Sequence, residues 1–247
     1  MATALGPRTV RVRWLVVEEE ETPHLRRWRG MLDADERLRA DRYRFVADRN
    51  IYTAAHALAR FMLSEATGLP TGAWRYVAGE FGKPGLAAEF SKCNLHFNIS
   101  HTRGLVACAI ARQEIGVDVE RFDRTVDLGI APHYFAPEEV RILDSVSPDQ
   151  QRKLFFRFWS LKEAFIKARG EGLRRPLNSF SFALEPVGVA FHPDRNDLPG
   201  HDDPAEWRFW EWRPANGCVA ALAVRSAQAN SIELDAGPAG EAEIGPL

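Results

Sequence analysis

Two long segments with helical periodicity stand among short segments typical of strands, and this alternation constrains the fold of the chain most. The first helix is predicted over residues 48–67, with Asp48 as its cap and Gly68 and Pro70 as its stop. The second is predicted over residues 148–169, before Gly170. At 247 residues, the chain is long enough for one large domain or two small ones.

Short alternating or apolar segments fill much of the remaining sequence. The predicted strands cover residues 9–17, 94–99, 105–111, 115–120, 180–184, 207–213 and 218–225. The last two are joined by Pro214-Ala215-Asn216-Gly217, a sequence typical of hairpins. A short helix is predicted to begin at Pro137. Residues 226–247 show no periodicity and are predicted to form a loose tail.

Composition argues against several classes of protein. A formal net charge of −2 argues against nucleic-acid and membrane-surface binding. The longest apolar runs, residues 105–111 and 218–224, are too short to cross a bilayer. The sequence opens without a secretory signal pattern, and its three cysteines are scattered. We therefore expect a cytoplasmic protein.

Arginine is strongly preferred over lysine. The 32 basic residues comprise 27 arginines and five lysines, a skew that genome composition explains for the most part. Three of the five lysines, Lys83, Lys162 and Lys167, fall in segments that carry candidate site residues. A compact ammonium suits a point contact to phosphate, so these lysines are expected to mark the site.

Asp118 and Glu120 belong to a predicted strand that is otherwise apolar. Residues two apart on a strand share a face, so the two carboxylates project together. They could lie at a strand end facing solvent, or pair with arginine. Alternatively they hold a hard divalent cation, since all-oxygen ligands suit magnesium or manganese.

Trp159, Glu163 and Lys167 are spaced four residues apart on the second predicted helix and share one face. On an ordinary surface helix, Glu163 and Lys167 would form a solvated ion pair. The neighbouring sequence is rich in phenylalanine, which favours a less exposed stripe. Glu163 could then be a third oxygen ligand or a general base, with Lys167 meeting a phosphate.

Two further segments contain candidate binding residues. Ser100 and His101 directly follow the predicted strand of residues 94–99. As neighbours in an extended segment they face opposite sides, so they cannot act as a nucleophile–base pair. Their polar surroundings suit an anionic ligand better. Gly82-Lys83-Pro84 lies in the predicted glycine–proline turn of residues 81–86, which a plain loop would explain equally well.

Taken in order, these motifs resemble those of the Sfp-type 4′-phosphopantetheinyl transferases. The resemblance covers about residues 33–173, and it is carried by the following segments: Gly82-Lys83-Pro84, Asn98-Ile99-Ser100-His101-Thr102, Gly116-Val117-Asp118-Val119-Glu120 and Trp159-Ser160-Leu161-Lys162-Glu163-Ala164 with Lys167. It implies an α/β (α+β) monomer of two similar halves, each with a long helix on a small, mostly antiparallel sheet. The expected divisions are residues 1–113 (adenosine-phosphate side), 114–225 (metal and pyrophosphate side) and the tail 226–247.

The resemblance also implies a reaction. Phosphopantetheine would pass from coenzyme A to a serine of an apo acyl or peptidyl carrier protein, with Mg²⁺ or Mn²⁺ as cofactor and adenosine 3′,5′-bisphosphate as the second product. Carrier proteins are acidic, so the docking surface should be apolar with a basic rim. Residues 121–135 have that composition, although Phe122 and Phe135 could equally be core residues.

Matching positions imply individual roles. Asp118, Glu120 and Glu163 would be metal ligands, Glu163 the proton acceptor and Lys167 a contact to the pyrophosphate. The implied coenzyme A contacts are Arg39, Gly82, Lys83, Pro84, Ser100 and His101, with Arg37 as a further candidate. The sequence departs from the family at Thr102, where serine is commoner, and at Ile51, where many relatives carry a basic residue.

Two other functions fit the same residues. A metal-dependent phosphohydrolase acting on a nucleotide would use the carboxylates with water as nucleophile. A degenerate relative would bind carrier proteins or coenzyme A without transfer, but the presence of Asp118, Glu120, Glu163 and Lys167 counts against it.

Overall fold

The computed structural model describes residues 4–79, 82–192 and 202–246. The chain divides into two compact units, one formed by Met1–Gln113 with Ile232–Leu247 and the other by Glu114–Ser231. The second unit begins at Glu114 and ends at Ser231, and the C-terminal segment belongs to the first unit.

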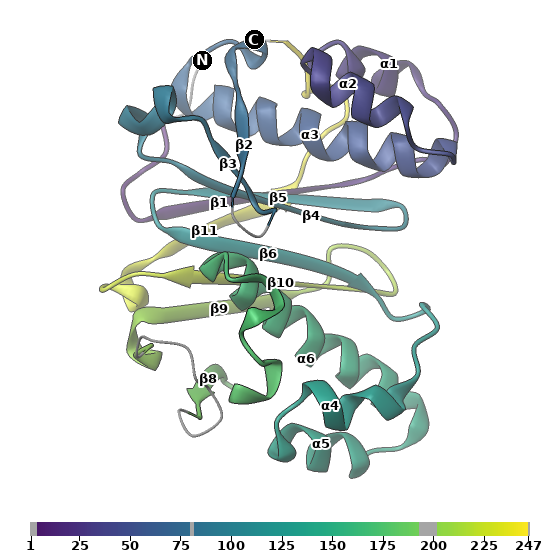
Figure 1. The fold of residues 1–247 in the computed structure, drawn as a ribbon, viewed down its shortest axis with the longest axis vertical. Coiled ribbons are helices and arrows are strands. Elements are labelled where there is room, and N and C mark those ends of the chain that lie inside the picture. Colours follow the sequence, from purple (N-terminus) through teal and green to yellow (C-terminus); the bar gives the residue numbers. More distant parts are fainter. Residues whose placement is uncertain (1–3, 80–81, 193–201, 247) are drawn as a thin grey trace. The chain divides into compact units, whose positions relative to one another are not determined.

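The first unit packs a long helix on a four-stranded sheet (Figure 1). Its elements are β1 (Thr9–Val16), α1 (Pro23–Arg29), α2 (Ala34–Asp41), α3 (Val46–Thr67), β2 (Tyr76–Ala78), β3 (Pro84–Leu86), β4 (His96–Thr102), β5 (Leu105–Ala111) and β11 (Glu233–Pro238). The sheet order is β11-β1-β5-β4, and β2 and β3 form a separate hairpin. Helix α3 contacts β4 and β5, and its apolar residues form much of the core.

The second unit packs a long helix on a three-stranded antiparallel sheet. Its elements are β6 (Glu114–Arg121), α4 (Ala131–Tyr134), α5 (Pro137–Asp144), α6 (Pro148–Arg169), β7 (Phe180–Leu184), β8 (Val187–Phe191), β9 (Trp207–Trp212) and β10 (Cys218–Arg225). The sheet order is β6-β10-β9, and β7 pairs with β8. Helix α6 lies against β6 and β10 over a core rich in phenylalanine.

The expected arrangement of a long helix on a small, mostly antiparallel sheet is confirmed in each unit. Helix α6 has the predicted bounds, whereas α3 begins at Val46 with Phe45 as its cap. Asp48, the predicted cap, lies in the first helical turn, where its charge is favourable to the helix dipole. The strand predicted over residues 94–99 begins and ends later, so that Ser100 and His101 both belong to β4. The sequence patterns did not predict α1, α2, α4, β2, β3, β8 or β11.

The prediction of a loose tail over residues 226–247 is wrong. Residues 233–238 form β11, which pairs in parallel with β1. Arg11 and Arg13 of β1 both form ion pairs with Asp235, at 2.9 and 2.8 Å. The sequence of this segment does not alternate between apolar and polar residues, so no strand was predicted there. Its strand conformation depends on pairing with β1, more than 200 positions earlier in the sequence.

Among the residues that the structure describes, no helix combines the length and the apolar character needed to cross a membrane.

Candidate active site

Strand β6 carries the two acidic residues of the site. Asp118 and Glu120 are only 4% and 8% exposed, so both carboxylates are largely removed from solvent. On the central strand β10, Ala221 pairs with Asp118 and Val219 pairs with Glu120. The alternation of the strand places both acids on one face, as predicted, but burial excludes the solvent-facing alternative.

Helix α6 brings Glu163 and Lys167 to the same place. The Lys167 ammonium lies 2.6 Å from Asp118 Oδ1. This ion pair joins the last turn of helix α6 to strand β6. Glu163 is half-buried, and its pKa is raised by burial and, to a smaller extent, by the charge of Asp118. Asp118, Glu163 and Lys167 are therefore electrostatic neighbours.

Glu120 lies in an unfavourable environment for a carboxylate. Burial raises its pKa to about 7, with the negative charge of Asp118 as the second cause. Arg124 opposes this effect from 3.3 Å, where its guanidinium donates to both carboxylate oxygens. Burial and mutual repulsion of the acids are the conditions under which a bound cation stabilises carboxylates most.

The three carboxylates are suitable ligands for a hard divalent cation, but their positions in this structure do not form a coordination site. Three carboxylates offer only oxygen ligands, which suit Mg²⁺ or Mn²⁺. Within the described ranges, however, no three histidine, cysteine or acidic side chains are already grouped closely enough to hold an ion. Asp118 is instead bonded to Lys167, so side-chain adjustment would accompany metal binding.

In the first unit, the predicted contacts lie on β4 and at the β2–β3 hairpin. Ser100 is buried and His101 is exposed, as expected for neighbours on opposite faces of a strand. Gly82 has a φ of +80°, a left-handed conformation that favours glycine and turns the chain into β3. Pro84 begins β3, which contacts β4, so Lys83 and Pro84 lie on an element next to the strand of Ser100. Phe81 of the predicted turn lies outside the described residues.

Arg39 lines a cavity of about 580 Å³ at α2. Its other lining residues are Asp35, Leu38, Arg42 and Tyr43. The Arg39 guanidinium also lies 6.0 Å from the centre of the Tyr52 ring. Arg42 and Tyr43 directly follow α2 and were not among the predicted contacts, although they are close neighbours of Arg39 in the sequence. Ile51, by contrast, is buried in the core.

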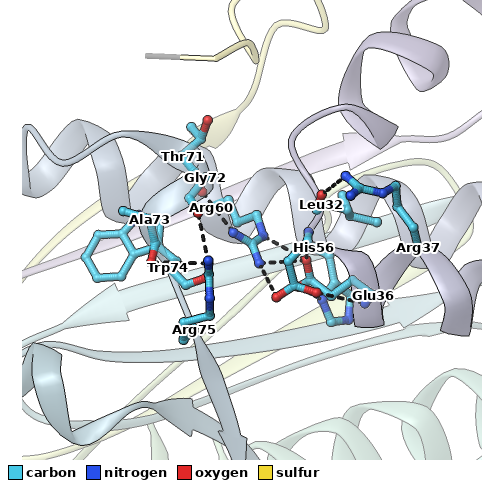
Figure 2. A network of polar contacts seen from close by, with 11 residues as sticks. Leu32, Glu36, Arg37, His56, Arg60, Thr71, Gly72, Ala73, Trp74 and Arg75 are labelled. Carbon is cyan, nitrogen blue, oxygen red and sulfur yellow. Dashed lines mark hydrogen bonds and ion pairs between the residues drawn. The ribbon is translucent and has the colours of Figure 1, made fainter.

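A buried network holds α2 on α3 (Figure 2). Arg60 of α3, which is fully buried, pairs with Glu36 and Asp33 at 2.7 and 2.9 Å. His56 lies 2.7 Å from the second oxygen of Glu36, and Arg60 also donates to the Thr71 carbonyl. Asp33 and Glu36 form a capping box, the local signal from which α2 could have been predicted.

Lys162 is not a site residue, contrary to the expectation that the lysines of these segments mark the site. Its side chain has no exposure and pairs with Glu139 at 2.8 Å. It also donates to the carbonyl oxygens of Leu177 and Phe180. Lys162 therefore holds the interior of the second unit together, whereas Lys167, five residues later, reaches the acids of β6.

Both units match protein families of one kind. The family described as the 4′-phosphopantetheinyl transferase superfamily matches residues 114–223, and that described as 4′-phosphopantetheinyl transferase, N-terminal, matches residues 19–113. The 4′-phosphopantetheinyl transferase HetI of Nostoc sp. is 33% identical over 213 residues, which are 85% of this chain and 86% of that protein.

Two relatives from Bacillus subtilis are similarly close. The 4′-phosphopantetheinyl transferase ffp is 34% identical over 198 residues, 80% of this chain and 84% of its own. The 4′-phosphopantetheinyl transferase Sfp of strain 168 is 33% identical over 188 residues, 76% and 80% of the two chains. With such similarity across both units, the chain belongs to the 4′-phosphopantetheinyl transferase superfamily.

Proposed function

We propose that this protein transfers 4′-phosphopantetheine from coenzyme A to a serine of an apo acyl or peptidyl carrier protein. The serine oxygen forms a new bond to the phosphorus next to the pantetheine, and the bond from that phosphorus to the bridging oxygen breaks. Adenosine 3′,5′-bisphosphate leaves with the electron pair. The observation that carries the proposal is the grouping of Asp118, Glu163 and Lys167 in a member of this family.

Asp118, Glu120 and Glu163 would hold Mg²⁺, or Mn²⁺ in its place. When bound, the ion would neutralise charge on the pyrophosphate, the chief requirement of phosphoryl-type transfer. Support comes from the burial and mutual repulsion of these carboxylates, which a divalent cation would relieve.

The protein's own residues would supply charge and proton transfer. Lys167, one helical turn beyond Glu163, would place its positive charge beside the pyrophosphate. Glu163 would accept the proton of the carrier serine, a role that its raised pKa favours because a more basic carboxylate is a better proton acceptor near neutral pH. The mechanism needs no nucleophile from the enzyme.

The first unit would bind the rest of coenzyme A. Arg39, with Arg37 as a further candidate, would meet the 3′-phosphate, and the cavity beside Arg39 supports this assignment. Gly82, Lys83 and Pro84 would lie along the adenine and its neighbouring phosphate, and Ser100 and His101 would contact phosphate groups. Among these residues, Arg39 offers a planar guanidinium, Lys83 a compact ammonium and Ser100 a hydroxyl group, all of which suit anionic ligands.

The carrier protein would dock on residues 121–135 of the second unit, as a partner of a cytoplasmic monomer. Arg124 and Tyr134 are exposed on this segment, where Arg124, besides donating to Glu120, would attract an acidic partner. Phe122 and Phe135 are buried in the core and are not part of that surface.

The intact mass of apo carrier proteins tests the function directly. Incubation with this protein, coenzyme A and Mg²⁺ should add about 340 Da to an accepted carrier, the mass of the phosphopantetheine group. A panel of fatty-acid, polyketide and nonribosomal-peptide carriers would identify the natural class. Phosphate release from coenzyme A without a carrier would instead indicate a phosphohydrolase.

Replacement of Glu163 tests the catalytic assignment. Glu163→Gln removes a proton acceptor and a charged ligand while keeping the shape of the side chain, so the rate of transfer should fall by at least about 10²-fold. Glu114→Gln, on an exposed residue of β6, is the matched control and should transfer at the normal rate. Near-normal turnover by a folded Glu163→Gln protein would refute the assignment.

A further inference from the structure

Gly116 of β6 lies in direct backbone contact with helix α6. A Cβ atom built at this position would lie 2.1 Å from the carbonyl oxygen of Ala164 and 2.3 Å from the backbone nitrogen of Ala168. It would also lie 2.9 Å from the carbonyl carbon of Lys167. Real Cβ atoms essentially never come so close, and all three neighbours are backbone atoms that cannot rotate away.

The contact lies between the two sets of candidate site residues. Gly116 is two positions before Asp118, and Ala164 directly follows Glu163. Lys167 both contacts Gly116 through its backbone and reaches Asp118 through its side chain, at 2.6 Å. The separation of β6 and α6 at Gly116 therefore sets the separation of their functional groups.

The helix has little freedom to move along the sheet instead. One residue before Glu163, the Lys162 side chain pairs with Glu139 and donates to Leu177 and Phe180. Phe165 is fully buried in the same core. Added volume at position 116 would thus be relieved mainly by separation of the helix from the strand.

Not every glycine of this unit lies at a close contact that excludes a side chain. Gly188 of β8 has no atom within 4 Å of the corresponding Cβ position. The close approach at Gly116 is therefore a local feature, and Gly188 offers a matched control for the loss of backbone freedom that accompanies any glycine-to-alanine change.

We infer that Gly116 is a positioning residue. Because it has no side chain, α6 can approach β6 closely enough for Glu163 and Lys167 to act together with Asp118 and Glu120. The inference rests on the proposed function. Relief of the overlap that an added Cβ would create requires a movement of about 1 Å, and a misplacement of about that size can lower the rate of a catalysed reaction about 10²-fold.

The experiment compares Gly116→Ala and Gly188→Ala with the wild type. We expect Gly116→Ala to keep its far-ultraviolet circular dichroism but to lose about 10²-fold in kcat for transfer. Its Kd for Mn²⁺, measured without coenzyme A from the electron paramagnetic resonance of free Mn²⁺, should rise at least about tenfold because the carboxylates have separated. Gly188→Ala should stay within about twofold of the wild type in both.

A measurement on the wild type checks the contact without a substitution. A nuclear Overhauser effect should connect a Gly116 α-proton to the Ala168 amide proton, since the Cβ direction points at that nitrogen. Absence of this signal would show that the approach does not exist and would overturn the inference.

The remaining outcomes are also decisive. A folded Gly116→Ala protein with wild-type kcat and Mn²⁺ affinity would contradict the inference alone, because transfer by the wild type would uphold the proposed function. A Gly116→Ala chain that fails to fold would make this glycine a determinant of stability and would likewise overturn the positioning role. A wild type that does not transfer contradicts the proposed function itself.

Discussion

Glu120 shows how the burial of a single carboxylate can oppose folding. Its pKa is raised from 4.5 to about 7, first by burial and then by Asp118. The folded protein therefore holds this proton more tightly than the unfolded chain does. The carboxyl group costs no stability below its unfolded pKa, and the cost grows as the pH rises from 4.5 toward 7.

Glu120→Gln should consequently stabilise the metal-free protein at pH 8. We expect the free energy of unfolding to increase by about 1 to 3 kcal/mol, because one pKa unit corresponds to about 1.4 kcal/mol. The gain should shrink as the pH is lowered toward 5. Denaturant unfolding in the presence of a chelator measures the effect, with the exposed Glu114→Gln as control. A gain that does not change with pH would contradict this explanation.

Helices α3 and α6 share a buried charge arrangement. Arg60 lies fourteen residues after Val46, the first residue of α3, and Lys162 lies fourteen residues after Pro148, the first residue of α6. Each pairs with the glutamate at the third position of the preceding eight-residue helix, Glu36 of α2 or Glu139 of α5. The parallel supports an internal repeat. A Gly-Leu pair also follows each long helix, at Gly68-Leu69 after α3 and at Gly172-Leu173 after α6.

Removal of one charge from such a pair should be strongly destabilising. Lys162→Met should lower the free energy of unfolding by about 3 to 5 kcal/mol, because Glu139 would remain buried without its cation. Adding Glu139→Gln should recover much of that loss. Urea unfolding measures both variants, and Lys153→Met, at an exposed position of α6, is the control. A double variant no more stable than Lys162→Met would show that charge burial is not the cause.

The chain as a whole builds its first unit from two distant segments. Besides pairing β11 with β1, the C-terminal segment buries Ile244 completely. The Ile244 carbonyl accepts hydrogen bonds from Arg27 and Trp28 of α1, at 2.7 and 3.1 Å. Residues 232–246 thus hold both the sheet edge and α1.

A chain ending at Ser231 should lose stability in the first unit alone. Backbone amides of β1 and α1 should lose protection from hydrogen exchange, whereas those of β10 should keep it. Exchange followed by mass spectrometry of peptides separates these regions. A chain ending at Gly245, which retains Ile244, is the control. Equal loss of protection in β10 would contradict separate stabilisation of the two units.

Local sequence patterns were sufficient to predict which of the candidate site residues share a face of a strand or helix. The two-residue period of β6 puts Asp118 and Glu120 on one face, and the helical period of α6 aligns Glu163 with Lys167. Both relations depend only on neighbours within four positions. They could therefore be inferred before any fold was known.

Contacts between distant residues were decided only by tertiary packing. No local period pairs β11 with β1, joins Lys162 to Glu139 or brings α6 against Gly116. Lys162 and Lys167 have similar sequence surroundings, yet one is buried in the core and the other reaches Asp118. The physical reason is that burial and ion pairing depend on which surfaces meet in space, whereas periodicity specifies only which side chains share a face.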